Sequence, residues 1–134
     1  SIEPEATDNI NDQDLAKSGL DADILDSLRG GLSNEQIKEI LVSFYEKADE
    51  LIAEIGTSYL KGDVISLNAR AHELKGMAGN FGFSEISAMC ADIEKAAKEN
   101  NLTLAHEPIQ YLGEKYSISR SYLNKWLDTQ NRSQ

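Results

Sequence analysis

The chain has 134 residues, of which 40% are hydrophobic and 27% charged, the composition of a single ordinary globular domain. A net charge of −10 repels nucleic-acid phosphates, and no apolar run reaches the ~20 residues that a membrane helix needs, so we expect neither nucleic acid nor membrane as a partner. One cysteine, Cys90, leaves no internal disulfide framework and is typical of a reducing compartment, so we expect a cytoplasmic location.

The first 19 residues (SIEPEATDNINDQDLAKSG) are acidic and have no sustained apolar period, which predicts a flexible tail or linker over 1–19. From Leu20 onward the pattern of apolar residues becomes helical. A short helix is predicted over 20–29, and it is followed by Gly30–Gly31, a common helix stop.

Residues 33–36 (SNEQ) have the form of a capping box and predict the start of a long second helix. Its apolar residues recur at helical spacing and define one buried stripe: Ile37, Ile40, Leu41, Phe44, Ala48, Leu51, Ile52, Ile55 and Tyr59. Gly62–Asp63 ends this helix and starts a third one, whose apolar stripe runs from Val64 to Phe81 and which ends near Gly82.

Ser84 is predicted to cap a fourth helix that closes at Asn100–Asn101. We place the start of the last helix near Pro108, because proline suits a first helical turn, with Thr103 as the cap of an extra turn. The inner faces of these two helices are Ile86, Met89, Cys90, Ile93 and Ala97, then Ile109, Leu112, Tyr116, Leu123 and Trp126.

Four long amphipathic helices with short polar links predict an all-α fold, an antiparallel four-helix bundle with a short additional N-terminal helix. We place the bundle at 20–127 and a C-terminal tail at 128–134. The short helix over 20–29 is expected to cap one end of the bundle.

The stretch AHELKGMAGNFG (71–82) places a histidine among glycines within a helix. His72 lies about 100° around the helix axis from the core residue Ala71, so we expect it on an exposed stripe. The other members of this stripe are polar or lack a side chain: Asn68, Lys75, Gly76 and Gly79. An exposed, neutral imidazole is a competent nucleophile, a lysine one turn away would offset phosphoryl charge, and the glycines would let another macromolecule approach the helix backbone.

These residues resemble the core motif of the histidine-containing phosphotransfer (HPt) domain, which reads alanine-histidine-x-leucine-lysine-glycine and then has a glycine six residues after the first. The chain matches it from Ala71 to Gly76 and at Gly82, and by helix pattern over about residues 20–127. The resemblance implies that His72 accepts a phosphoryl group from a receiver-domain aspartate and passes it to another receiver in a two-component phosphorelay. It also implies that Lys75 stands near the phosphoryl group and that Gly76 admits the receiver.

HPt domains often hold the imidazole with a glutamine from the next helix, and the matching residue here is Glu94. A carboxylate can accept the second ring N–H and so fix the tautomer, but it also repels a nearby phosphate. We therefore expect a transfer site made of His72, Lys75 and Glu94. The receiver is expected to contact Asn68, Gly76, Gly79, Ile24 and Leu28.

Two other interpretations stay open. The run from His72 to Lys75 also resembles the phosphoacceptor box of sensor-kinase dimerisation domains, but that box has a proline five residues after its histidine, where this chain has Met77. Those domains are hairpins completed by a second subunit, whereas this chain supplies four long helices and is expected to be a monomer. The other alternative is a helical bundle that binds receivers without phosphate chemistry.

We expect no cofactor or nucleotide site. We also expect no metal site, because the candidate ligands His72 and Glu73 point about 100° apart and His106 is placed in the loop before Pro108. Without an ATP site of its own, the chain is a phosphotransfer intermediate, and whether it counts as an enzyme stays open. The absent first methionine and the acidic leading segment favour a piece of a hybrid sensor kinase, at the cytoplasmic end of a membrane-anchored chain.

Overall fold

The computed structural model describes residues 9–132 of the chain. This part forms six helices: α1 (Asp12–Lys17), α2 (Ala22–Arg29), α3 (Asn34–Lys61), α4 (Val64–Asn80), α5 (Ser84–Lys98) and α6 (Leu102–Arg132). No strand occurs among the described residues, and the prediction of an all-α bundle is confirmed. None of the helices in this part of the chain combines the length and the apolar character that a membrane crossing requires.

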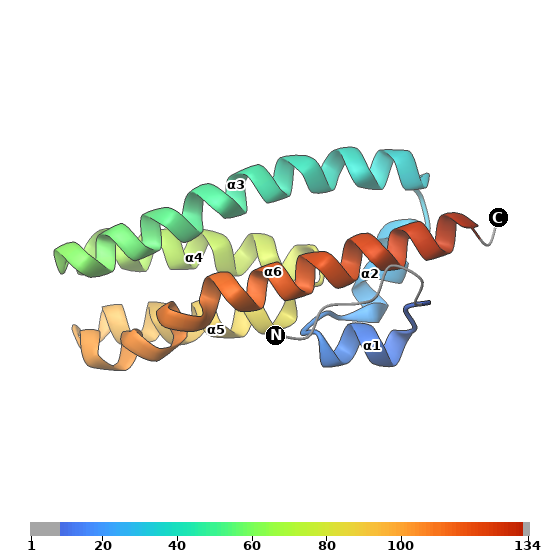
Figure 1. Cartoon of the computed structure of the whole chain (residues 1–134). Helices are drawn as coiled ribbons and strands as arrows, with labels where there is room; N and C mark the ends of the chain where they lie inside the picture. Colours follow the sequence, from blue (N-terminus) through green and yellow to red (C-terminus); the bar gives the residue numbers. More distant parts are fainter. Residues whose placement is uncertain (1–8, 133–134) are drawn as a thin grey trace.

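The four long helices α3 to α6 form an antiparallel bundle (Figure 1). Each packs against the next one in the chain, and α6 closes the ring against α3, so α4 and α6 lie diagonally opposite each other. The helices α3 and α6 have 28 and 31 residues, against 17 and 15 in α4 and α5. At 1.5 Å per residue α3 is about 16 Å longer than α4. Figure 1 shows α1 and α2 at the end where the long pair extends beyond the short pair.

The N-terminal segment differs from the predicted tail over 1–19. Residues 1–8 lie outside the described part, but three apolar side chains around α1 are buried: Ile10, Leu15 and Leu20. The hydroxyl of Ser119 on α6 donates a buried 2.6 Å hydrogen bond to the Ser18 carbonyl, which ties this segment to the bundle. The tail prediction is therefore wrong for residues 9–19. A six-residue helix with one buried side chain leaves no apolar period to detect.

Two predicted helix boundaries agree with the structure. Ser33 and Gln36 form the expected reciprocal capping box at the start of α3. Gly62 ends α3 in the left-handed conformation (φ 67°), and the Asp63 side chain caps α4 by accepting a hydrogen bond from the Ser66 N–H. Glycine reaches that φ without the steric cost of a Cβ, so the α3–α4 link needs only two residues.

The predicted cap of α5 is wrong. Phe83 occupies the cap position and makes no side-chain cap hydrogen bond. The Ser84 hydroxyl instead donates to the Gly19 carbonyl at 3.1 Å, and the Glu85 N–H donates to the same carbonyl at 3.1 Å. Ser84 therefore fixes the link between α1 and α2 against the start of α5.

The last helix begins at Leu102, so its predicted start near Pro108 is also wrong. The Asn101 side chain accepts a 3.3 Å hydrogen bond from the Leu104 N–H and begins the helix without a contribution from Thr103. Pro108 consequently lies inside α6. His106, expected in a loop, is an exposed helical residue.

At its other end α6 continues to Arg132, so the predicted tail is wrong for residues 128–132, while 133–134 lie outside the described part. Trp126 and Leu127 are buried near this end, and the Arg29 guanidinium of α2 lies 5.1 Å from the centre of the Trp126 ring. Lys38 of α3 forms a 3.5 Å ion pair with Asp128. These contacts with α2 and α3 continue the packing of the helix past the predicted boundary.

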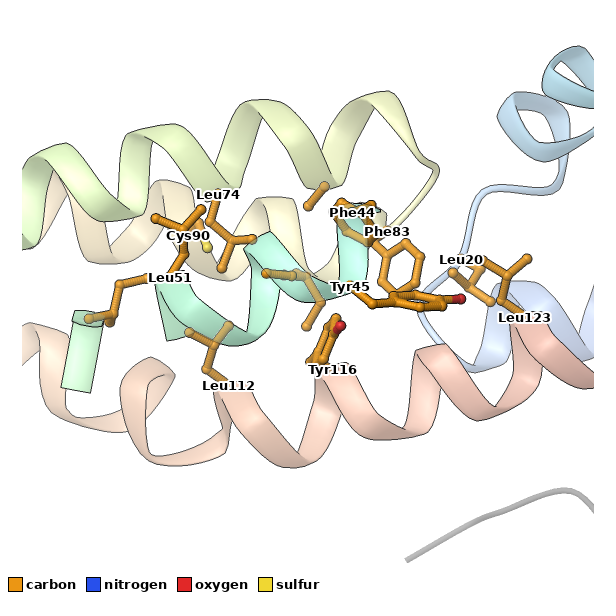
Figure 2. Close-up of a cluster of buried hydrophobic side chains, with 14 of the residues drawn as sticks. Leu20, Phe44, Tyr45, Leu51, Leu74, Phe83, Cys90, Leu112, Tyr116 and Leu123 are labelled. Carbon is orange, nitrogen blue, oxygen red and sulfur yellow. The ribbon is translucent and has the colours of Figure 1, made fainter. Parts of the chain in front are cut away.

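The core of the bundle leads into an aromatic cluster near the α4–α5 link (Figure 2). The ring of Phe44 lies 4.8 Å from that of Phe81 and 5.1 Å from that of Phe83, centre to centre. Tyr116 of α6 lies 6.0 Å from Phe83, which is fully buried. Because Phe83 belongs to the link, this cluster fixes the position of the α4–α5 hairpin relative to α3 and α6.

Candidate functional site

His72 lies at the surface near the middle of α4. Its neighbours Ala71 and Leu74 are fully buried, and they set the rotation of the helix about its axis. The side chain of His72 consequently remains 69% exposed. The position of the histidine in the apolar pattern had predicted this exposure.

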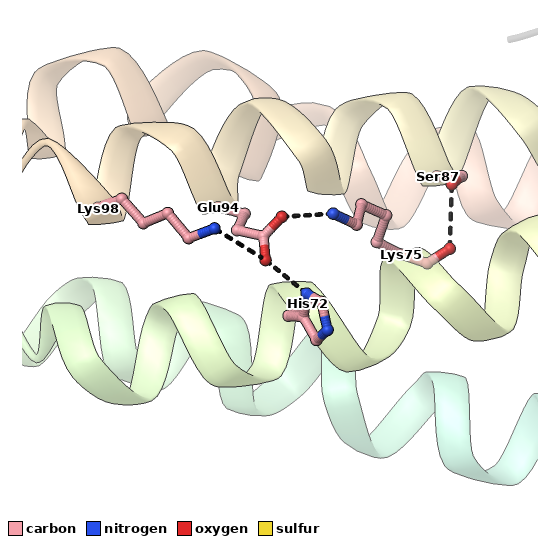
Figure 3. A network of polar contacts seen from close by, with 5 residues as sticks. All are labelled: His72, Lys75, Ser87, Glu94 and Lys98. Carbon is pink, nitrogen blue, oxygen red and sulfur yellow. Dashed lines mark hydrogen bonds and ion pairs between the residues drawn. The ribbon is translucent and has the colours of Figure 1, made fainter.

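A buried carboxylate from α5 holds one side of the imidazole (Figure 3). Glu94 is only 6% exposed, and its Oε2 lies 2.6 Å from His72 Nδ1. Its Oε1 accepts a 2.5 Å hydrogen bond from Lys75 Nζ, and Lys98 Nζ lies 3.7 Å from Oε2. Of the three predicted site residues, Glu94 therefore contacts both of the others, His72 and Lys75.

The lysines decide the charge state of this cluster. The hydrogen bond from Lys75 is the largest influence and lowers the pKa of the Glu94 carboxyl below its ordinary value, against burial, which raises it. The hydrogen bond with His72 and the charge of Lys98 lower it further. Two ammonium groups and one ionised carboxylate leave one net positive charge beside the ring.

An ionised carboxylate has only acceptor atoms, so the Nδ1 of a neutral His72 must carry the proton of their shared hydrogen bond. The lone pair then resides on Nε2, which Figure 3 shows on the side of the ring that faces away from Glu94. The site thus presents an oriented nitrogen nucleophile at the surface, with cations nearby. This arrangement suits attack on an electrophile that carries negative charge.

The three glycines that follow His72 differ in their surroundings. A Cβ at Gly76 would meet no atom within 4 Å, so this position is open to solvent. A Cβ at Gly79 would lie 3.5 Å from Ser87 Oγ, so Gly79 faces α5. Gly82 has φ +78°, and a Cβ there would lie 3.2 Å from Leu25 of α2. Only Gly76 thus provides the open approach that the sequence suggested for the first two.

The remaining predicted contact residues are half-buried: Asn68, Ile24 and Leu28. The amide oxygen of Asn68 is buried and has no hydrogen-bond partner in the described part of the chain. Leu28 lines a small apolar hollow with Leu32, Ile37, Ile40, Leu41 and Phe81. Ile40, predicted to be buried, is 39% exposed beside this hollow.

The contact of Lys98 with the site was not predicted. Lys98 follows Glu94 by four residues on α5, and a glutamate followed by lysine at that spacing places the two side chains on the same helical face. That spacing was the available signal. The bond between Lys75 and Glu94 had no such signal, because it joins two helices.

The second histidine lacks the features of the first. His106 is exposed on α6, and its Nδ1 lies 3.0 Å from the hydroxyl of Tyr59. A hydroxyl can donate or accept, so this contact does not select a tautomer. Among residues 9–132, no group of three or more His, Cys, Asp or Glu side chains is placed to hold a metal ion.

Comparison with known proteins gives consistent results. The family model of the Hpt domain matches residues 39–128. The fold is similar to that of the histidine-containing phosphotransfer protein MtHPt2 from Medicago truncatula, with a TM-score of 0.77 at 19% identity over 87% of this chain and 82% of that one. It is also similar to HptB from Pseudomonas aeruginosa (TM-score 0.74, 23% identity, 84% and 96% covered) and to ZmHP2 from maize (0.75, 18%, 89% and 90%). No curated protein sequence matches the chain.

Proposed function

The chain belongs to the Hpt domain family, and on that premise we propose that His72 is the residue that carries the phosphoryl group. Membership of the family gives the chain the role of a phosphotransfer carrier in two-component phosphorelays. The observation that supports His72 as the acceptor is its 2.6 Å hydrogen bond to Glu94, which leaves Nε2 as the exposed nucleophile.

In the proposed reaction the Nε2 lone pair attacks the phosphorus of an aspartyl phosphate on a receiver domain. The N–P bond forms while the P–O bond breaks, and the electron pair of that bond remains on the receiver's carboxylate. Attack by the aspartate of a second receiver reverses these steps. Lys75 and Lys98 reduce the repulsion between the incoming phosphoryl oxygens and Glu94.

Hpt proteins interact with receiver domains, and we propose that the receiver of this chain docks over the exposed side of α4 and the adjoining face of α2. The open space at Gly76 supports this placement. The apolar hollow at Phe81, the residue that follows α4, is nine positions after His72, about 13 Å along the helix axis, within reach of the same partner. The residues proposed to contact the receiver are Asn68, Gly76, Ile24 and Leu28; Gly79, which faces α5, is left out.

The two alternative functions have less support. A dimerisation domain relies on a second subunit to complete its bundle, whereas here one chain encloses a core in which Leu51, Leu67 and Leu112 are at most 1% exposed. We therefore propose that the chain is a monomer. We also propose that it acts with its receivers in the cytoplasm. A bundle that only binds receivers would not need an oriented ring nitrogen, so the His72–Glu94 contact favours the carrier.

The test is phosphate uptake from a phosphorylated receiver by the wild-type chain, His72→Gln and His106→Gln. We expect wild type and His106→Gln to acquire acid-labile, base-stable phosphate and His72→Gln to acquire none. Unchanged far-UV circular dichroism would show that His72→Gln is folded, as an exposed substitution should be. Labelling of folded His72→Gln at the wild-type level would disprove the assignment.

A further inference from the structure

Glu94 contacts Nδ1 of His72, the ring nitrogen that can gain or lose a proton once Nε2 carries a phosphoryl group. When Nε2 bonds to phosphorus, the imidazole ring becomes positively charged, and this charge is relieved if the Nδ1 proton is lost. The hydrogen-bond partner of Nδ1 therefore determines whether the loaded ring keeps that proton. In this chain the partner is a carboxylate, buried and 2.6 Å away.

The protonation of Nδ1 controls how well the ring leaves the phosphorus. In the donating step a receiver carboxylate oxygen bonds to phosphorus, the N–P bond breaks, and its electron pair returns to Nε2. With Nδ1 protonated, the group that leaves is a neutral imidazole. Without that proton it would be an imidazolate anion, which is a far poorer leaving group.

A carboxylate and an amide act differently at this position. An ionised Glu94 can only accept a hydrogen bond, so it favours the protonated Nδ1. A glutamine would offer both an acceptor oxygen and a donor NH₂, and it could turn its NH₂ toward an unprotonated Nδ1. We propose that Glu94 makes His72 a labile carrier, because its carboxylate retains the Nδ1 proton of the phosphorylated ring and keeps the imidazole a good leaving group.

The proposal requires that Glu94 stays ionised beside a phosphoryl group. Lys75 Nζ bonds to Oε1 at 2.5 Å, and Lys98 Nζ approaches Oε2 to 3.7 Å, so both oxygens have a cationic neighbour. The ion pairs that connect α3 with α4 join Lys47 to Glu73 and Glu54 to Arg70, and none of them includes His72. In the described part of the chain, the ion pair recorded for His72 is the one with Glu94 of α5, and Glu94 in turn pairs with Lys75 of α4 and Lys98 of α5.

The inference rests on the proposed role of His72, and its experiment separates the two. The complete chain and its Glu94→Gln and Glu99→Gln variants are loaded by a phosphorylated receiver, and donation to fresh receiver is timed between about pH 6 and about pH 10. Glu99 is exposed near the end of α5, so its variant removes the same charge away from the ring. Thermal unfolding of each variant confirms that it is folded.

We expect the three proteins to donate at similar rates at the acidic end. Above neutral pH, donation by Glu94→Gln should decline about one pH unit earlier than donation by wild type and Glu99→Gln, a difference of about tenfold at fixed pH. The ¹⁵N chemical shifts of phosphorylated His72 should show that Glu94→Gln also loses the Nδ1 proton about one pH unit earlier than wild type. Superimposable profiles, or a decrease by one factor at every pH, would overturn the inference while leaving the carrier role intact. A wild type that takes up no phosphate would overturn both.

Discussion

The open space at Gly76 can be tested by filling it. We expect Gly76→Gln to stabilise the fold and to block the receiver. Glycine in a helix interior costs about 1 kcal/mol relative to alanine, and glutamine is a good helix former. Because a Cβ at this position meets no atom within 4 Å, nothing in the fold opposes that gain. The free energy of unfolding should therefore rise by about 0.5 to 1 kcal/mol, or roughly 3 °C in Tm.

The effect on docking follows from the direction of helical side chains. They point toward the N-terminus of their helix, so a side chain at position 76 covers the turn that contains His72. A glutamine there would occupy the space through which a receiver must reach Nε2. We expect the receiver Kd to rise by about tenfold or more, equivalent to about 1.4 kcal/mol, and phosphotransfer to fall with it.

Gly113 provides a matched control. It is exposed in the interior of α6, a Cβ there also meets no atom within 4 Å, and α6 lies diagonally opposite α4 in the bundle. Gly113→Gln should give a similar gain in Tm with unchanged receiver binding, as measured by circular dichroism and titration calorimetry. Normal transfer by a stabilised Gly76→Gln would place the docking surface elsewhere. A Gly76→Gln that is less stable than wild type would refute the open environment of this position.

Three further changes test other parts of the structure. Lys75→Met keeps the aliphatic stem but removes the cation; the transfer rate should fall more than receiver affinity, because an exposed ion pair with the receiver would add only about 0 to 1 kcal/mol to docking, and a change confined to the Kd would contradict this. Leu15 is the one fully buried side chain of α1, so Leu15→Ala should lower the free energy of unfolding by about 2 to 4 kcal/mol, as measured by urea titration. An unchanged free energy of unfolding would mean that α1 is not part of the folded unit. The pKa of Glu94 is lowered in the folded state from its ordinary value of 4.5. The ionised carboxylate therefore stabilises the fold fully at pH values above 4.5, and this contribution is lost as the pH falls through the pKa of the folded state. The stability difference between wild type and Glu94→Gln should accordingly narrow from about pH 7 to about pH 3, and a pH-independent difference would contradict the ion pairs.

The elements that could be predicted are those whose cause is local in the sequence. The stripe of α3 repeats over 28 residues, and the capping residues Ser33 and Asp63 act within three positions of themselves. The exposure of His72 follows from its angle to Ala71 on one helix. Each of these rests on interactions between residues that are close in the chain.

The errors arose where distant parts of the chain meet. Ser84 has the composition of a cap, yet its hydroxyl bonds to the Gly19 carbonyl, 65 residues away. Gly79 shares a helical stripe with Gly76, but the packing of α5 against α4 makes it an interhelical position. No pattern in α4 alone could distinguish these two glycines, because the difference lies in what α5 places opposite them.

The contact between His72 and Glu94 depends both on spacing within the α4–α5 hairpin and on packing by distant residues. Phe83 stands in the α4–α5 link, eleven positions after His72 and eleven before Glu94. In an antiparallel hairpin, residues at equal distance from the turn face each other; here they lie about 12 Å from the end of α4 and about 15 Å from the start of α5. The register therefore depends on where the chain reverses, and the burial of Phe83 among Phe44 and Tyr116 fixes that point. The sequence placed the turn near Gly82 but did not show which residue anchors it. The pairing of the nucleophile with its carboxylate is thus a consequence of an aromatic core that lies outside the site.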